Sequence, residues 1–147
     1  MNRQREVHVA RGNLESFLRR VKRELGLAKS DVTVCLISDA EMARLNQSFR
    51  KKKGPTDVLS FPATVRKGPV RLPRRTPKSK TVQNLGDIAI SPATARRYAR
   101  KHGRKLPGEL RVLVLHGVLH LLGYDHEADH GEMDRLEQKF RKRLGIA

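Results

Sequence analysis

Cysteine and aromatic residues are scarce in this chain of 147 residues. The sequence contains no Trp, two Tyr, four Phe and a single cysteine, Cys35. One cysteine permits neither an internal disulfide nor a zinc site built on several thiolates, and it favours a reducing compartment such as the cytoplasm. We interpret Cys35 as a small buried core residue.

Long apolar runs are also missing. No segment reaches the roughly 18 consecutive apolar residues of a membrane-spanning helix. The first residues, MNRQREVHVARGN, lack the apolar core of a secretion signal. Because a chain of this length suits one hydrophobic core, we expect residues 1–147 to form a single cytoplasmic domain with no membrane partner.

Acidic residues are few compared with basic ones. Lys and Arg number 32 against 15 Asp and Glu, which gives a formal net charge of +17. This charge exceeds what solubility requires and predicts a polyanionic partner. So basic a domain is expected to bind RNA or DNA through their phosphates, without reading a sequence.

Hydrophobic periodicity predicts an α+β fold with four short strands and about five helices. The expected strands are Glu6–Ala10, Asp31–Ser38, Thr56–Pro62 and Leu85–Ile90, of which the apolar second one is expected at the centre of the sheet. The expected helices follow N-caps at Asn13, Asp39 and Ser91, begin near Pro107, and include Met133 to Leu144. Phe49 is expected in the buried stripe of the second helix. Residues from about 63 to 84 lack periodicity and predict a long basic loop.

The segment HGVLHLLGYDH, residues 116–126, carries the strongest chemical signal. His116 and His120 are four residues apart, which places both rings on one face of a helix. Gly123 readily ends a helix, so the chain can turn back and bring His126 to the same point. Three imidazoles with an open fourth position suit a catalytic zinc ion, and we predict one Zn²⁺ on His116, His120 and His126.

This spacing matches the metal-binding part of the zincin signature HExxHxxGxxH, except that position 117 is Gly. In zincins the Glu at this point takes a proton from zinc-bound water. A zincin-like metallopeptidase is therefore an alternative function that would lack its base, and Gly117 would instead leave room above the metal for a nucleotide. A second alternative is a non-catalytic RNA-binding ribosome assembly factor, in which the metal only stabilises the fold.

The same segment resembles the HGxLHLxGYDH signature of the YbeY family, also called rRNA maturation factors. Further matches are Leu45-Asn46 with Phe49-Arg50, the segment PTDVLSFP at 55–62 and LGDI at 85–88, whereas the basic segment 66–80 lies outside the shared motifs. The resemblance implies helices packed on a small mixed sheet, with zinc on the three histidines of a zincin-like helix.

The resemblance also implies an activity and its partners. The activity is that of a single-strand-specific, metal-dependent endoribonuclease that acts in rRNA maturation, notably at the 3′ end of 16S rRNA, and in ribosome quality control. The implied partners are ribosomal RNA, the small ribosomal subunit and ribosome-associated proteins such as the GTPase Era. An arginine corresponding to Arg50 is functionally important in that family.

The remaining site candidates are assigned by chemistry. A guanidinium aimed at the charge that develops on phosphorus is useful in RNA cleavage, and Arg50 is our candidate for this catalytic role. Asp125 either orients an imidazole or forms a turn. Candidates to line the cleft are Asp87, Asp57, Ser60 and Phe61, although the two aspartates can equally cap turns. Phe61 is either a stacking surface for an unpaired base or a core residue.

Overall fold

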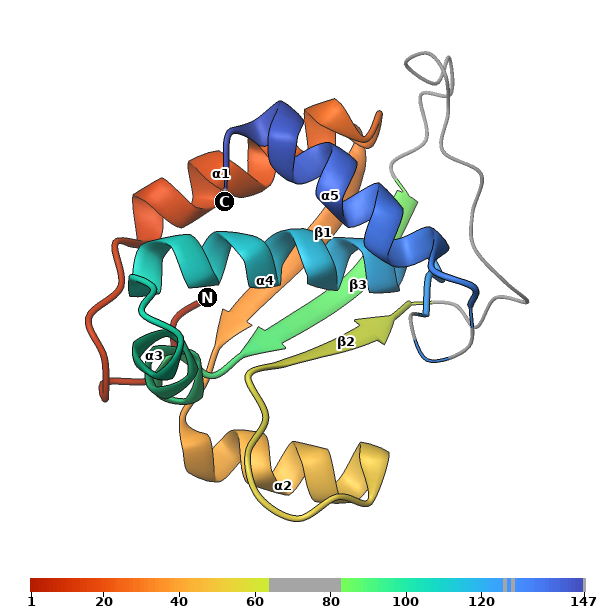
Figure 1. Cartoon of the computed structure of the whole chain (residues 1–147). Coiled ribbons are helices and arrows are strands. Elements are labelled where there is room, and N and C mark those ends of the chain that lie inside the picture. Colours follow the sequence, from red (N-terminus) through yellow and green to blue (C-terminus); the bar gives the residue numbers. More distant parts are fainter. Residues whose placement is uncertain (64–82, 126, 128, 147) are drawn as a thin grey trace.

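The computed structural model describes residues 1–63, 83–125, 127 and 129–146. Its elements in chain order are α1 (Arg11–Glu24), β1 (Ser30–Leu36), α2 (Asp39–Arg50), β2 (Val58–Pro62), β3 (Gln83–Ile90), α3 (Pro92–Lys101), α4 (Leu106–Leu121) and α5 (Glu132–Leu144) (Figure 1). The α+β class and the expectation of about five helices are confirmed. No helix in the described part of the chain has the length and apolar character needed to cross a membrane.

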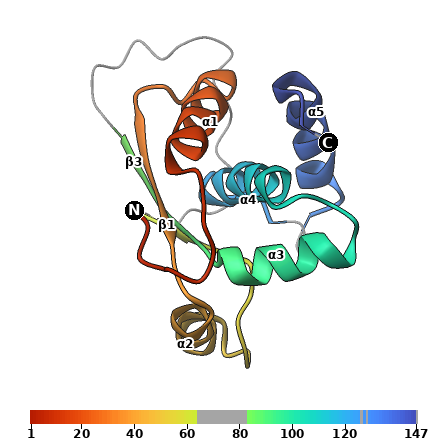
Figure 2. The ribbon, with the colours of Figure 1, turned by 90° about the vertical axis from the view of Figure 1, so that its left-hand side faces the viewer.

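The sheet is mixed and has the strand order β1-β3-β2, with β1 parallel and β2 antiparallel to β3. The expected central position of residues 31–38 is therefore wrong, because β3 is the central strand. Helices α1 and α4 cover one face of the sheet, α2 covers the other, and α3 and α5 pack against α4 (Figures 1 and 2). Helix α4 therefore packs on one face of the edge strand β2, and α2 packs on the other.

The expected fourth strand, Glu6–Ala10, does not form, so the described sheet has three strands. The Gln4 side chain donates to the Val7 carbonyl and accepts from the Val7 N–H, both at 2.9 Å. These local bonds satisfy the groups that a strand would have paired with a neighbour. Instead, Asn2 forms an isolated parallel bridge to Leu36 at the end of β1.

Two other expected boundaries shift. Helix α1 begins at Arg11 after Ala10, without a side-chain cap, rather than after Asn13. The basic loop expected at about 63–84 ends earlier, because β3 begins at Gln83. Residues 64–82, which include the segment 66–80, lie outside the described residues.

Helix α4 is the centre of the core. It is apolar on most sides, as its sequence predicts, and it packs against β2, β3, α1, α3 and α5. Its fully buried side chains are Val114, Leu115, Val118, Leu119 and Leu121. Side chains at the end of such a helix are held firmly, because a close-packed interior leaves them little room to move.

Asp39 joins α2 to α3. The N-cap of α2 is Ser38, whose Oγ accepts from the Glu41 N–H at 3.2 Å, so the expected cap at Asp39 is wrong. The Asp39 carboxylate instead accepts bonds of 2.6 Å from the hydroxyls of Ser91 and Thr94 and pairs with Arg97 at 2.7 Å. Burial opposes ionisation of Asp39, but the bonds from Arg97, Ser91 and Thr94 outweigh it and hold its pKa below the usual value.

We expect Asp39→Asn to lower the free energy of unfolding at pH 7 by about 1–3 kcal/mol, because the carboxylate accepts three bonds at once. The stabilisation is present above the usual unfolded aspartate pKa of about 3.9 and is lost as the pH falls through the lower folded-state pKa. The free energies of unfolding of wild type and variant should therefore approach each other as the pH falls. Urea denaturation of both proteins from pH 7 to pH 3 measures this. Asp31→Asn, at an exposed position of β1, is the control and should behave as wild type at every pH.

Candidate functional site

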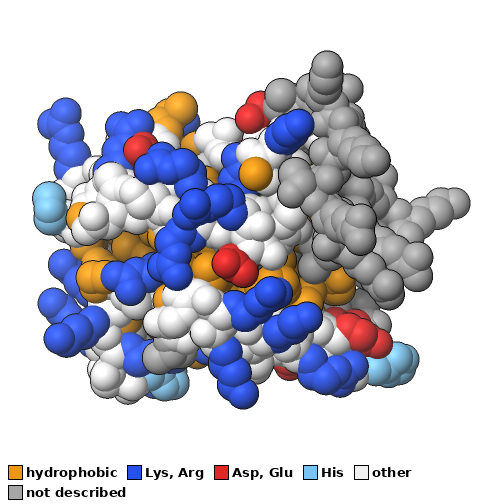
Figure 3. Space-filling view, turned by 90° about the horizontal axis from the view of Figure 1, so that it is seen from above, with side chains coloured by type: hydrophobic (Ala, Val, Ile, Leu, Met, Phe, Trp, Pro, Cys, Tyr) orange, Lys and Arg blue, Asp and Glu red, His pale blue; other side chains and the backbone are white. Residues whose placement is uncertain are grey.

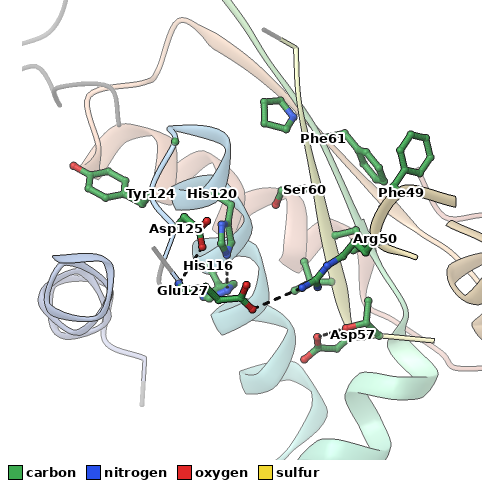
Figure 4. Close-up of a pocket in the computed structure, with 15 residues that line it drawn as sticks. Phe49, Arg50, Asp57, Ser60, Phe61, His116, His120, Tyr124, Asp125 and Glu127 are labelled. Carbon is green, nitrogen blue, oxygen red and sulfur yellow. Dashed lines mark hydrogen bonds and ion pairs between the residues drawn. The ribbon is translucent and has the colours of Figure 1, made fainter. Parts of the chain in front are cut away.

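A cavity of about 760 Å³ opens along the edge strand β2, between the C-terminal ends of α2 and α4 (Figure 4). Its walls contain many of the residues that the sequence analysis selected. The lining residues are Phe49, Arg50, Thr56, Asp57, Val58, Leu59, Ser60, Phe61, Pro62, His116, His120, Gly123, Tyr124, Asp125 and Glu127. Segments far apart in the sequence thus meet in one pocket.

His116 and His120 lie on one face of α4 and point into this cavity (Figure 4). Their Nε2 atoms are 3.0 Å apart, and the ring planes are inclined by 74°. Both side chains are half-buried. The spacing of four residues therefore brings the two ring nitrogens to a common point.

Glu137 of α5 fixes the ring of His116, and sequence analysis missed it. Its Oε1 lies 2.9 Å from His116 Nδ1, and its Oε2 accepts from Arg141 at 3.1 Å. Burial raises the pKa of this carboxyl, but the hydrogen bond with His116 and the charges of His116 and Arg141 outweigh burial, so the pKa lies below the usual glutamate value. The sequence does contain a signal for Glu137: this acidic residue lies in the buried apolar stripe of α5, between Met133 and Phe140.

This arrangement fits a shared cation. When the neutral His116 ring donates its Nδ1–H to Glu137, its Nε2 lone pair points toward His120 Nε2. Two nitrogens on one tetrahedral zinc ion are about 3.3 Å apart, given Zn–N distances of about 2.0–2.1 Å. The 3.0 Å separation of the two Nε2 atoms is close to this value.

The third expected ligand, His126, lies outside the described residues. Among the residues that the structure does describe, no group of three His, Cys, Asp or Glu side chains is arranged to hold a metal ion. The predicted three-histidine zinc site therefore stays a prediction, of which the structure provides the His116 and His120 pair.

Gly117 does not leave room for a nucleotide, contrary to our expectation. The residue is buried, and a Cβ added there would lie 2.8 Å from Cγ2 and 2.9 Å from Cδ1 of Ile88 in β3. Gly117 thus faces the sheet, on a different side of α4 from the two histidines. Its missing side chain brings α4 close to β3.

Arg50 faces the histidines from the opposite wall, at the last residue of α2. Its Nη2 lies 3.9 Å from Oε1 of Glu127, another residue that sequence analysis missed. Both side chains are substantially exposed, so this pair contributes little to stability and opens readily.

Phe49 and Phe61 form an aromatic pair on the same wall. Their ring centroids are 5.0 Å apart in an edge-to-face arrangement. Phe49 was expected in the buried stripe of its helix, but 66% of it is exposed. That expectation is wrong because the last turn of α2 extends past the buried cluster around Met42 to the rim of the cavity.

Of the other candidates, Ser60, Asp125 and Asp57 line the pocket and Asp87 does not. Ser60 Oγ donates to the Gly117 carbonyl at 3.1 Å and so ties β2 to α4. The Asp125 carboxylate lines the cavity and accepts from the Glu127 N–H at 3.0 Å, which is a turn-forming bond. Asp57 also lines the cavity, whereas the exposed Asp87 pairs with Phe61 in the sheet and does not reach the cavity wall.

Comparisons with known proteins agree over nearly the whole chain. A family model described as "Endoribonuclease YbeY" matches residues 1–145. The endoribonuclease YbeY of Solibacter usitatus is 44% identical over 133 residues, covering 90% of this chain and 78% of the relative. That of Aquifex aeolicus is 38% identical over 134 residues, covering 91% and 79%. The solution structure of TM1509 from Thermotoga maritima is similar, with a TM-score of 0.62 and 29% identity, covering 98% of this chain and 89% of that one.

We expect Gly117→Ala to destabilise the protein by about 1–3 kcal/mol, because its Cβ would overlap the Ile88 side chain and push α4 from the sheet. The measurement is the midpoint of chemical denaturation. Gly108→Ala on the same helix is the matched control: a Cβ there meets nothing within 4 Å, so stability should be unchanged or slightly higher. Equal effects of the two substitutions would contradict the role of close packing at Gly117.

Proposed function

The chain belongs to the endoribonuclease YbeY family, and on this premise we propose that it cleaves phosphodiester bonds of single-stranded RNA during ribosomal RNA maturation. The observation that supports this most is the single cavity into which His116, His120 and Arg50 point together. A paired imidazole site facing a guanidinium suits a substrate whose reacting group is an anion.

We propose that His116, His120 and His126 hold one zinc ion. Zinc in such a site supplies a Lewis acid for a phosphate oxygen and lowers the pKa of a bound water to about 7. The chain's own contribution is the orientation of the ligands: Glu137 accepts the Nδ1–H of His116 and so directs Nε2 into the cavity. Arg141 holds the second oxygen of that carboxylate.

Arg50 binds the scissile phosphodiester in this proposal. Its guanidinium pairs with Glu127 only through an exposed contact of 3.9 Å, so a phosphate can displace the carboxylate at small cost. Phosphate oxygens accept two parallel N–H bonds from a guanidinium, and the interaction strengthens as negative charge builds on the reacting phosphorus.

A metallopeptidase is not supported. The general base of a zincin is a Glu at the position of Gly117, and the space for any side chain there is occupied by Ile88. The pocket side of α4 also offers no carboxylate next to the two histidines on the same helix, because Gly117 and Val118 follow His116.

The charge of the surface suits RNA beyond the cavity. Lys and Arg side chains spread over the face formed by α1 and α5 (Figure 3). The exposed ones on these helices include Arg19, Arg23, Lys139, Lys142 and Arg143. Affinity that depends on phosphates suits ribosomal RNA, and we propose the small ribosomal subunit as the partner. We propose the cytoplasm as the compartment of this activity.

The proposal is tested by incubating zinc-loaded protein with an unstructured RNA. Internal cleavage by wild type and its loss in His116→Ala would support it, and equal behaviour of the two proteins would refute it. The product ends identify the nucleophile, because attack by the 2′-hydroxyl leaves a cyclic phosphate on the upstream fragment. A melting curve of His116→Ala establishes whether the metal stabilises the fold as well.

We expect Glu137→Gln to weaken zinc binding by roughly 10- to 100-fold, because a neutral amide replaces the charged carboxylate that accepts the Nδ1–H of His116. Competition against a chromophoric chelator measures the affinity. Glu24→Gln, at an exposed residue of α1 that pairs with Arg143, is the control and should bind zinc as wild type does. Unchanged affinity in Glu137→Gln would contradict the orienting role.

We expect Arg50→Ala to lower kcat/KM for RNA by on the order of 100-fold while the fold and zinc content stay unchanged. Arg44→Ala removes an exposed arginine from the same helix, outside the cavity lining, and should retain nearly full activity. Comparable losses in both variants would mean that Arg50 contributes only to general charge.

A further inference from the structure

The rim of the cavity carries an apolar surface that the metal chemistry does not use. Phe49 exposes 66% of its surface and lies beside Arg50 in the sequence and in the cavity wall. The other large apolar residues exposed in the described part of the chain are Met1 and Tyr98, and neither lines this cavity. Exposed aromatic surface at a pocket rim is typical of a ligand contact.

The end of α2, which carries Phe49, is held in place by hydrogen bonds. Asn46, one turn earlier in α2, is 4% exposed and donates from Nδ2 to the Gly54 carbonyl at 2.9 Å. The Lys52 N–H returns to the Asn46 carbonyl at 3.3 Å, and Lys51 ends the helix in a left-handed conformation. These bonds fix the end of α2 and its connection to β2.

Phe61 supports the ring from the side. The two planes are inclined by 73° at a centroid distance of 5.0 Å, an arrangement that stabilises aromatic pairs. Because an edge-to-face contact does not cover both faces of both rings, aromatic surface stays open to solvent, as the exposure of Phe49 shows.

Tyr98 of α3 provides the contrast. It is also exposed and lies in a basic region, but the His102 ring lies 4.4 Å from its centroid and the Arg104 guanidinium 5.7 Å. Its ring is therefore contacted by both an imidazole and a guanidinium of the chain, whereas the Phe49 ring is contacted edge-to-face by Phe61. Phe49 combines an open ring with a neighbouring guanidinium, which are the two groups that bind a base and its phosphate.

We propose that Phe49, supported by Phe61, is a nucleobase-binding subsite that stacks one unpaired base of the RNA next to the phosphate bound by Arg50. This inference rests on the proposed function. A phenyl ring carries no hydrogen-bonding group, so the subsite accepts any base. A base within a duplex has both faces covered by its neighbours, so the subsite selects single-stranded RNA.

The test measures binding of zinc-loaded protein to a short 2′-O-methyl oligoribonucleotide that carries 2-aminopurine, whose fluorescence is quenched by stacking. Wild type, Phe49→Ala, Phe49→Leu, Phe49→Trp and the matched control Tyr98→Ala are compared, each with its melting curve. A gel after each titration verifies that the probe is intact, and cleavage of unmodified RNA is assayed separately.

We expect Phe49→Ala and Phe49→Leu to bind on the order of 10-fold more weakly and to lose the quenching, Phe49→Trp to retain both, and Tyr98→Ala to match wild type. The KM for RNA should rise in Phe49→Ala with little change in kcat.

Several results would overturn the proposal. Wild-type affinity in Phe49→Leu would show that the contact is only burial of apolar surface and not stacking. An equal loss of affinity in Tyr98→Ala would show that any exposed aromatic residue has this effect. If wild type cleaves RNA and Phe49→Ala binds and cleaves equally well, the subsite is wrong while the nuclease function stands. If wild type neither binds nor cleaves RNA, both proposals are wrong.

Discussion

The close contact between Gly117 and Ile88 sets the distance between α4 and the sheet, and the cavity depends on that distance. Because Gly117 has no side chain, α4 lies near enough to β3 for Ser60 of the neighbouring strand to bond to the Gly117 carbonyl at 3.1 Å. The histidines on either side of this contact, one and three residues away, are thereby held beside the edge of the sheet. The absence of a Cβ at this position serves packing and does not create space.

The edge position of β2 explains why residues from both faces of the sheet share one pocket. Along this strand, Ser60 faces α4 whereas Leu59 packs with the cluster under α2, as the alternation of strand side chains requires. Phe61 contacts Phe49 of α2. At a central strand these two layers would be separated by the sheet. At the edge they meet, so α2 contributes Arg50 and α4 contributes His116 and His120 to the same cavity (Figure 4).

Two carboxylates in the site have contrasting electrostatic roles. Glu137 is buried, accepts from His116 on one oxygen and from Arg141 on the other, and has a pKa below the usual glutamate value, so it is the carboxylate that orients His116. Glu127 is exposed, and its Oε1 lies as far as 3.9 Å from Arg50 Nη2, so this ion pair is weak. The buried pair of Glu137 and His116 is therefore a fixed structural interaction. The exposed pair of Glu127 and Arg50 is the one that a phosphate displaces in the proposed function.

Local spacing was enough to predict the α+β class, the helices with strong periodicity and the placement of His116 and His120 on one face of a helix. The sequence also selected Arg50, Ser60, Phe61 and Asp125, which line the cavity. The central position of β3, the absence of a strand at residues 6–10 and the exposure of Phe49 at the cavity rim became apparent only from the three-dimensional arrangement. Glu137 enters the site from 21 residues beyond His116. Such facts depend on which distant segments meet, and hydrophobic periodicity reports that a face is buried without reporting what lies against it.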